Sequence, residues 1–141
     1  MSPKIERLIS LIFTTGRLLR ERSRDKSELD LFSILRLETL HYVERGGTPS
    51  MREMAEHLCV TPPSATSLIN ELVKSRQLAR IRDKRDRRIV RLALTPKGKR
   101  VMKTGFKRLT ARMRKIFANL DDKEINSLIK ILEKLSQTYR F

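Results

Sequence analysis

The chain contains 141 residues, which is enough for one compact domain with a hydrophobic core. It carries a formal net charge of +16 and has a pI near 10.9, so a polyanionic partner such as nucleic acid is expected. No apolar stretch is long enough to span a bilayer, and charged residues interrupt the first 19 positions. We therefore expect a cytoplasmic protein that contacts no membrane.

Residues 3–22 are expected to form the first helix, because apolar residues recur every three or four positions from Ile5 to Leu19. These apolar residues follow two lines along the helix, so two neighbouring surfaces are needed to cover them. Residues 29–45 are expected to form the second helix. Gly46 and Gly47 would end it, since glycine adopts left-handed backbone angles readily.

Two short helices follow. The first begins with a capping box, in which Ser50 and Glu53 satisfy each other's backbone N–H groups, and it extends to residue 58. The second starts at Thr61, whose hydroxyl can cap it, and continues through two prolines to residue 74. Two helices joined by so short a turn predict a helix-turn-helix motif.

The second of these short helices has apolar residues at the spacing of a half-buried helix. Its other face consists mainly of small hydrogen-bonding side chains, which allow close approach to base edges and phosphates in a major groove. The residues expected on this face are Ser64, Thr66, Ser67, Asn70 and Lys74. An ordinary solvated polar face is the alternative.

A two-stranded ribbon is expected from residues 78–83 and 88–94, because both segments are rich in β-branched and aliphatic residues. Positive side chains gather at its tip, where a hairpin can place them in a minor groove. They are Lys84, Arg85, Arg87 and Arg88. A charge run alone is usually solvated surface, but its position directly after a recognition-type helix favours DNA binding.

Two more helices complete the chain, one from residue 95 to about residue 118 and one capped by Asp121 with Glu124. The last helix has a broad apolar arc that a compact winged module cannot cover. Pairing of the terminal helices with those of a second copy would cover it, which predicts a twofold dimer. An intramolecular bundle of the long helices is the alternative.

The order of these elements, and the residues within them, resemble the multiple antibiotic resistance regulator (MarR) family of winged helix-turn-helix transcription factors. Residues 83–88, Asp-Lys-Arg-Asp-Arg-Arg, match the family's wing pattern Asp-x-Arg-Asp-x-Arg in full. Residues 94–98, Leu-Thr-Pro-Lys-Gly, match the Leu-Thr-x-x-Gly segment that follows the wing. Residues 54–58 look like the family's helix before the turn, and residues 61–72 look like its recognition helix.

The resemblance implies a mainly α fold with a small β-wing, in which N- and C-terminal dimerisation helices flank a winged helix-turn-helix. We therefore expect a single MarR-type domain over residues 1–141. Its DNA-binding part would be residues 29–96, and residues 1–28 and 97–141 would supply the dimerisation helices.

By the same resemblance, the protein would be a sequence-specific regulator of transcription, a repressor that binds a palindromic operator in double-stranded DNA as a homodimer. The recognition helix would enter the major groove and the wing the minor groove. The residues expected to contact DNA are Arg52, Thr61, Pro63, Ser64, Thr66, Ser67, Asn70, Lys74, Lys84, Arg85 and Arg87. Asp83 and Arg88 are expected to brace the wing through ion pairs.

Family members often bind small phenolic or lipophilic effectors in a crevice between the dimerisation and DNA-binding parts, and such an effector would release the DNA. The residues that could line this crevice are Phe13, Phe32, Leu35, His41 and Phe106, although each is more often ordinary core.

Cys59, the single cysteine, stands where family members often have glycine, so the turn is expected to need an unusual backbone angle or a different local geometry. A small buried residue is the simplest interpretation of a cysteine between Leu58 and Val60. One cysteine excludes an intramolecular disulfide, and it has no ligand partners at metal spacing, so neither a metal nor a cofactor is expected. The first helix contains no cysteine, which argues against peroxide sensing.

Other function classes are weaker. His41 and His57 are isolated, and no nucleophile, base and orienting acid can be assembled, so an enzyme is not expected. A reader of unpaired RNA would need aromatic side chains that this chain largely lacks. A non-specific architectural nucleic-acid-binding protein is the main alternative, and a winged module that binds an acidic protein is another.

Overall fold

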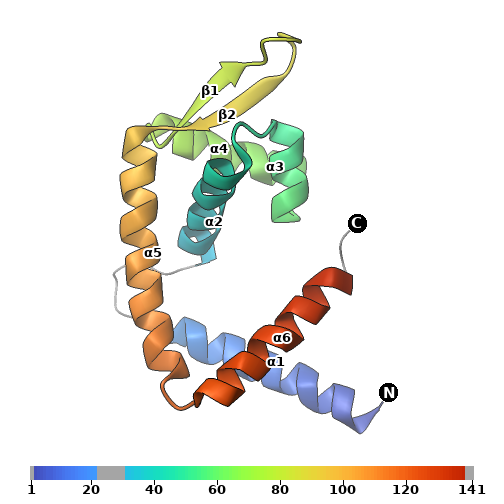
Figure 1. Cartoon of the computed structure of the whole chain (residues 1–141). Coiled ribbons are helices and arrows are strands. Elements are labelled where there is room, and N and C mark those ends of the chain that lie inside the picture. Colours follow the sequence, from blue (N-terminus) through green and yellow to red (C-terminus); the bar gives the residue numbers. More distant parts are fainter. Residues whose placement is uncertain (1, 22–30, 139–141) are drawn as a thin grey trace. The chain divides into compact units, whose positions relative to one another are not determined.

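A computed structural model describes the backbone of residues 2–21 and 31–138 and the side chains of residues 2–17 and 33–138. The described elements are α1 (Pro3–Glu21), α2 (Leu31–Gly46), α3 (Met51–Leu58), α4 (Pro62–Lys74), β1 (Leu78–Arg82), β2 (Val90–Leu94), α5 (Pro96–Phe117) and α6 (Asp122–Thr138). Figure 1 shows them along the chain. The expected mainly α fold with a small β-wing is confirmed. The expected last residue of the first helix, residue 22, and the expected first residue of the second helix, residue 29, lie outside the described residues.

The chain divides into two compact units, residues 1–103 and 104–141. The division falls within α5, a few residues beyond its start. In the first unit, α2 packs against α3 and β2, while α4 packs against α3 and β1. Figure 1 shows the β1–β2 hairpin extending beyond α3 and α4, so that its tip is free of both helices.

Side-chain caps set the helix starts, as the sequence predicted. The Glu53 backbone N–H donates to Ser50 Oγ at 3.2 Å, and the Ser50 N–H donates to Glu53 Oε2 at 3.0 Å, which completes the capping box of α3. Asp121 and Glu124 form the same exchange at the start of α6. The Thr61 hydroxyl accepts from the Ser64 N–H at 3.4 Å and caps α4.

The hydrophobic core of the first unit lies where α2, α3, α4 and the hairpin meet. Its most deeply buried side chains come from each of these elements, and they include Leu40, Val43, Met54, Ile69, Leu72, Leu78 and Leu92. Thr39 is buried among them, and its hydroxyl donates to the Leu35 carbonyl at 2.7 Å, so its polar atom has a partner. This shared core fixes the two helices of the helix-turn-helix to the hairpin.

An aromatic contact also joins α2 to α3. The rings of Tyr42 and His57 are stacked, with centroids 3.8 Å apart, and Glu38 Oε1 lies 3.4 Å from His57 Nε2. These contacts position α3 on α2.

The hairpin is antiparallel and in register from the pair Leu78–Leu94 to the pair Arg82–Val90. Its second strand begins at Val90, two positions later than expected. Residues 88 and 89 belong to the turn instead, because the Ile89 N–H donates to the Asp86 carbonyl at 3.0 Å while the Asp83 N–H donates to the Ile89 carbonyl at 3.0 Å. These bonds tighten the tip of the hairpin.

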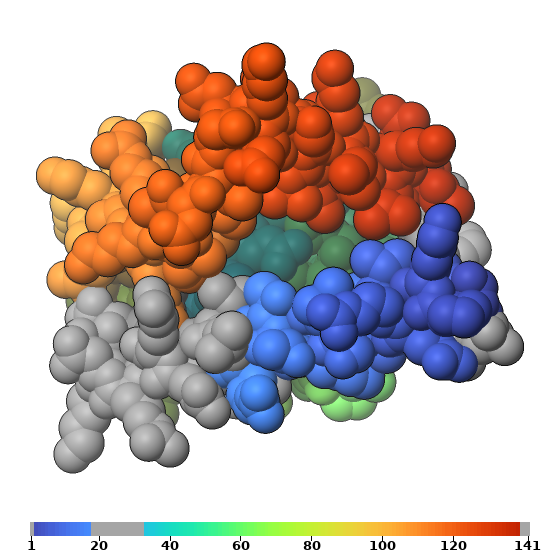
Figure 2. All heavy atoms as spheres, turned by 90° about the horizontal axis from the view of Figure 1, so that it is seen from below, coloured from blue at the N-terminus to red at the C-terminus, as the bar shows by residue number. Residues whose placement is uncertain are grey.

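Large apolar side chains are exposed on α1 and α6. Ile12 and Phe13 are 66% and 72% exposed, and Leu132 is 55% exposed. None of the described residues of α6 has a buried side chain. The atoms of both helices can be followed in Figure 2, α1 in blue and α6 in red.

Candidate nucleic-acid interface

The recognition helix α4 has one buried and one exposed face, as its sequence predicted. Its buried side chains are Ala65, Leu68, Ile69 and Leu72. The residues predicted to contact DNA from this segment all have exposed side chains, and these are Thr61, Pro63, Ser64, Thr66, Ser67, Asn70 and Lys74. All seven side chains are therefore accessible to a ligand.

Hydrogen bonds within the helix already commit some of these hydroxyl groups. Thr61 Oγ1 donates to Ser64 Oγ at 2.9 Å in addition to capping the helix. Thr66 Oγ1 donates to the Pro62 carbonyl at 2.9 Å, so in this conformation its oxygen can only accept from a ligand. Thr61 thus serves the start of the helix as well as its exposed face.

Two arginines from other elements hold side chains of the exposed face, and neither was predicted from the sequence. Arg36 of α2 pairs with Glu71 at 2.8 Å, which neutralises the one carboxylate on α4. Arg80 of β1 donates from Nη2 to Asn70 Oδ1. Arg80 is ten positions from Asn70 and Arg36 is 35 positions from Glu71, so only the packing of α2 and β1 against the recognition helix brings these groups together.

The turn before α4 corrects one prediction. Cys59 is exposed, not buried, and its backbone lies in the left-handed region with φ 52°. Its N–H donates to the Glu56 carbonyl at 3.3 Å, which ends α3. The left-handed angle turns the chain sharply and points the side chain outward, so the glycine-like backbone angle expected at this position is present although the residue is cysteine.

The wing tip is braced by Asp83. Its Oδ2 pairs with Arg91 Nε at 2.8 Å, and its Oδ1 accepts from the Arg85 N–H at 2.8 Å. Arg91 also donates to the Thr48 carbonyl at 3.1 Å, which ties the hairpin to the loop before α3. The Arg85 N–H and the Arg91 guanidinium hold the pKa of Asp83 below its usual value near 3.8.

The ion pair expected for Arg88 is not the one that forms. Arg91 occupies the Asp83 carboxylate, because its place on β2 directs its side chain across the hairpin. Arg88 contributes its backbone instead, donating from its N–H to Asp86 Oδ1 at 3.0 Å. The wing pattern contains Arg88 and not Arg91, so only the strand register identifies Arg91 as the partner of Asp83.

The wing cations predicted to contact DNA, Lys84, Arg85 and Arg87, are all exposed at the tip. The Arg87 carbonyl accepts from Arg82 Nη1 at 3.2 Å, so β1 supplies a further arginine that stiffens the turn. Arg52, predicted to contact a phosphate, is exposed on α3 and pairs with Glu56 at 3.2 Å. An exposed pair of this kind contributes little to stability and can exchange for a phosphate contact.

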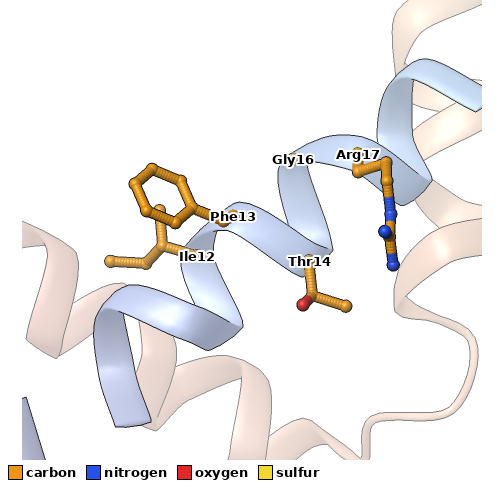
Figure 3. A pocket seen from close by; sticks show the side chains of 5 residues that line it. All are labelled: Ile12, Phe13, Thr14, Gly16 and Arg17. Carbon is orange, nitrogen blue, oxygen red and sulfur yellow. The ribbon is translucent and has the colours of Figure 1, made fainter. Parts of the chain in front are cut away.

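The five residues predicted to line an effector crevice are placed in different parts of the chain. Phe13 lines a hollow on α1 with Ile12, Thr14, Gly16 and Arg17. In Figure 3, Phe13 and Ile12 point to one side of the helix, and Thr14 and Arg17 point to the other. Phe106 lines a hollow formed by α5 and α6, and Leu35 and His41 are half-buried on α2. The Phe32 side chain lies outside the described residues, and the crevice remains a prediction.

Within the part of the chain that the structure describes, no cluster of His, Cys, Asp or Glu could hold a metal ion. The described helices also include none that is long and apolar enough to cross a bilayer.

Comparison with known proteins agrees with this geometry. The family model for the MarR family matches residues 32–90. An uncharacterized HTH-type transcriptional regulator, YpoP of Bacillus subtilis (strain 168), is 31% identical over 106 residues, which cover 75% of this chain and 72% of YpoP.

Solved structures show the same fold over nearly the whole chain. The transcriptional regulator BldR from Sulfolobus solfataricus superimposes with a TM-score of 0.76 at 24% identity, covering 97% of this chain and 99% of BldR. Streptococcus pneumoniae FabT, solved in complex with DNA, superimposes with a TM-score of 0.69 at 25% identity, covering 96% of this chain and 94% of FabT. The chain belongs to the MarR family of winged helix-turn-helix transcriptional regulators, which are DNA-binding proteins and not enzymes.

Proposed function

We propose that the protein is a sequence-specific repressor that binds a palindromic operator in double-stranded DNA as a homodimer. In this proposal α4 enters the major groove, and Lys84, Arg85 and Arg87 at the wing tip reach the adjacent minor groove. Twofold symmetry would set the two half-sites about one helical turn apart, roughly 34 to 36 Å.

The observation that carries the proposal is the joint placement of α4 and the hairpin on one core. Leu78 of β1 and Leu92 of β2 are buried in the same core as Ile69 and Leu72 of α4. The Asp83–Arg91–Thr48 contacts then hold the cationic tip in a fixed direction from that core. Two rigidly related elements, one hydroxyl-lined and one cationic, suit simultaneous contact with both grooves.

A dimer is supported by the exposed apolar residues on the terminal helices, such as Phe13 on α1 and Leu132 on α6. Contiguous apolar helix faces are rarely left in water, and a second copy offers a matching surface.

We also propose that a small lipophilic or phenolic effector weakens DNA binding. Of the residues predicted to line the crevice, Phe106 lies in a hollow formed by α5 and α6, whose largely apolar lining also includes Leu109, Met113 and Phe117. This hollow supports the proposal, although it lies within residues 104–141 and not between the two expected parts of the chain. Aromatic acids titrated into a DNA-bound sample would be the probe. A fall in DNA affinity that Met113→Ala abolishes is expected, whereas an unchanged affinity with every aromatic acid contradicts this part of the proposal.

Selection of bound sequences from random duplex DNA, followed by footprinting, tests the main proposal. The expected result is a short palindrome, bound at least about a thousandfold more tightly than random duplex. Coating of the DNA with little base preference would instead identify the architectural alternative.

The salt dependence of DNA affinity tests the role proposed for the wing. The slope of log affinity against log salt is negative, and replacing Arg85 and Arg87 with Ala should reduce its magnitude by about one unit for each lost contact. The double variant Lys123→Ala/Lys130→Ala on α6 is the control, because it also removes two positive charges from exposed positions outside the hairpin. If the slope of the wing variants matched that of this control, the hairpin would not lie in a groove.

A further inference from the structure

Asn70 of the recognition helix and Arg80 of the wing form a side-chain pair on the predicted DNA-facing surface. Both side chains are exposed, and Arg80 Nη2 donates to Asn70 Oδ1. Side chains alternate along a strand, so Arg80 shares the face of β1 that carries Leu78, which is buried in the core that includes α4. The strand therefore directs Arg80 toward α4.

The chemistry of the pair fixes the direction of the Asn70 amide. A guanidinium can only donate hydrogen bonds, so the amide must present its oxygen to Arg80. The NH₂ group of Asn70 then points away from Arg80.

The pairing changes which base the asparagine can read. A free asparagine reads adenine in the major groove by accepting from N6–H₂ while it donates to N7. Here the accepting oxygen lies beside a positive charge, so an amino group of adenine or cytosine would approach a cation. What the pair offers to DNA is donors, the Asn70 NH₂ and the remaining guanidinium N–H groups.

The base edge with two adjacent acceptors in the major groove is that of guanine, through N7 and O6. We propose that Asn70 and Arg80 act as one unit that selects guanine at a single position of each half-site. This inference rests on the proposed function and makes Arg80, a residue outside the recognition helix, a determinant of base specificity. The carboxylate of Glu71, the residue after Asn70, would repel the acceptor atoms of guanine, but it is paired with the guanidinium of Arg36.

The test compares three single variants, Asn70→Ala, Arg80→Ala and Arg82→Ala, and the double variant Asn70→Ala/Arg80→Ala. Arg82 is the matched control for Arg80, since it is an exposed arginine on the same face of β1 and bonds to the Arg87 carbonyl instead of α4. Affinity is measured for a panel of duplexes that carries each of the four base pairs at every half-site position. Thermal unfolding of each variant checks that it is folded.

The wild-type protein is expected to prefer guanine at one position by roughly 5- to 150-fold. Asn70→Ala and Arg80→Ala should each remove that preference at the same position, and the double variant should lose little more. Arg82→Ala should weaken binding to all duplexes by a similar factor.

A fourth single variant, Asn70→Asp, removes the N–H donors of residue 70 while it keeps the contact with Arg80. A carboxylate still pairs with the guanidinium but has no N–H to donate, and it can accept from the cytosine N4 amino group. The preference at this position should therefore fall for guanine and rise for cytosine.

The results that overturn the inference can be separated from those that overturn the proposed function. If the wild type selects an operator but Arg80→Ala weakens every duplex equally, Arg80 contacts only phosphates and the inference is wrong. Adenine at the Asn70-dependent position would also overturn it, because the asparagine would then read its base without Arg80. A wild type without any base preference overturns the proposed function itself.

Discussion

At the scale of single residues, Cys59 shows a position where local geometry and residue type disagree. It has φ 52°, a left-handed angle that costs a residue with a Cβ roughly 1 to 2 kcal/mol. Its thiol lies 3.6 Å from the Glu56 carbonyl and is exposed, so little packing offsets this cost. The turn between the two helices is therefore built around a strained residue.

We expect Cys59→Gly to raise the free energy of unfolding by up to about 1 kcal/mol, since glycine adopts this angle freely but loses more entropy on folding. Urea denaturation would measure the change. Val60→Gly is the control, because Val60 is not among the described residues with positive φ, and its replacement should lower stability. A loss of stability in Cys59→Gly as large as that in Val60→Gly would mean that the thiol makes a favourable contact.

Asp83 gives the wing a dependence on pH. Its pKa is lowered by the Arg85 N–H first and by Arg91 second. A carboxylate whose folded pKa lies below its unfolded value contributes stability above the unfolded pKa and loses it as the pH falls through the folded pKa. The brace should therefore be intact at neutral pH and be lost only in acid, below about pH 4.

Carbon-13 NMR titration of the Asp83 carboxyl should give a midpoint below 3.8, and the amide signal of Arg85 should move with it. In Asp83→Asn, which cannot ionise, the Arg85 amide should no longer respond to pH in this range. A midpoint for Asp83 at or above 3.8 would show that the carboxylate does not hold the turn.

At the scale of elements, the start of α5 is fitted against the end of the turn that follows α4. Thr95 Oγ1 donates to the Arg76 carbonyl at 2.6 Å and lies 3.0 Å from the Gln77 carbonyl oxygen, and it accepts from the Gly98 N–H at 3.0 Å. A Cβ at Gly98 would lie 2.0 Å from the Gln77 carbonyl oxygen and 2.9 Å from Leu94 Cδ1. The family's glycine at this position is required by close approach of backbone.

Gly98→Ala is expected to destabilise the fold by about 1 to 3 kcal/mol, because the methyl group must push backbone atoms apart. Thermal or urea unfolding would measure the loss. The comparison variant is Gly46→Ala, where an added Cβ meets nothing within 4 Å and the expected change is small. Equal effects of the two substitutions would contradict the close fit of α5.

At the scale of the whole molecule, the exposed apolar residues of the terminal helices predict the oligomeric state. On α6 these residues include Ile129, Ile131, Leu132 and Leu135, each about half exposed. Burial of this apolar surface in a twofold interface would stabilise the dimer by roughly 25 cal/mol for each Å² removed from water.

The protein should sediment as a dimer at micromolar concentration, and Leu132→Asp should shift it toward monomer because the carboxylate would be desolvated in the interface. Gln137→Glu adds the same charge at an exposed position of α6 whose neighbours one turn earlier are Glu133 and Lys134, and it should leave the dimer unchanged. A wild-type protein that sediments as a monomer would exclude the geometry of two half-sites.

Local sequence determined the elements of this protein and the motif they form. Ser50 with Glu53, and Thr61 before two prolines, specify helix starts through contacts between near neighbours. Apolar residues three and four positions apart specify the buried face of α4. The wing pattern at residues 83–88 could be recognised in the sequence, because its residues are consecutive and form a single turn. These features were predictable since the interacting groups lie within a few positions of each other.

Only the tertiary structure decided which distant side chains meet. Arg91 takes the Asp83 carboxylate in place of Arg88, Arg36 reaches Glu71, and Arg80 reaches Asn70. Each of these arginines looks like any other surface cation in the sequence, and its partner is set by strand register and by the packing of α2 and β1 against α4. A sequence pattern records the spacing along one element, whereas these contacts depend on the distance between elements, which the buried core fixes.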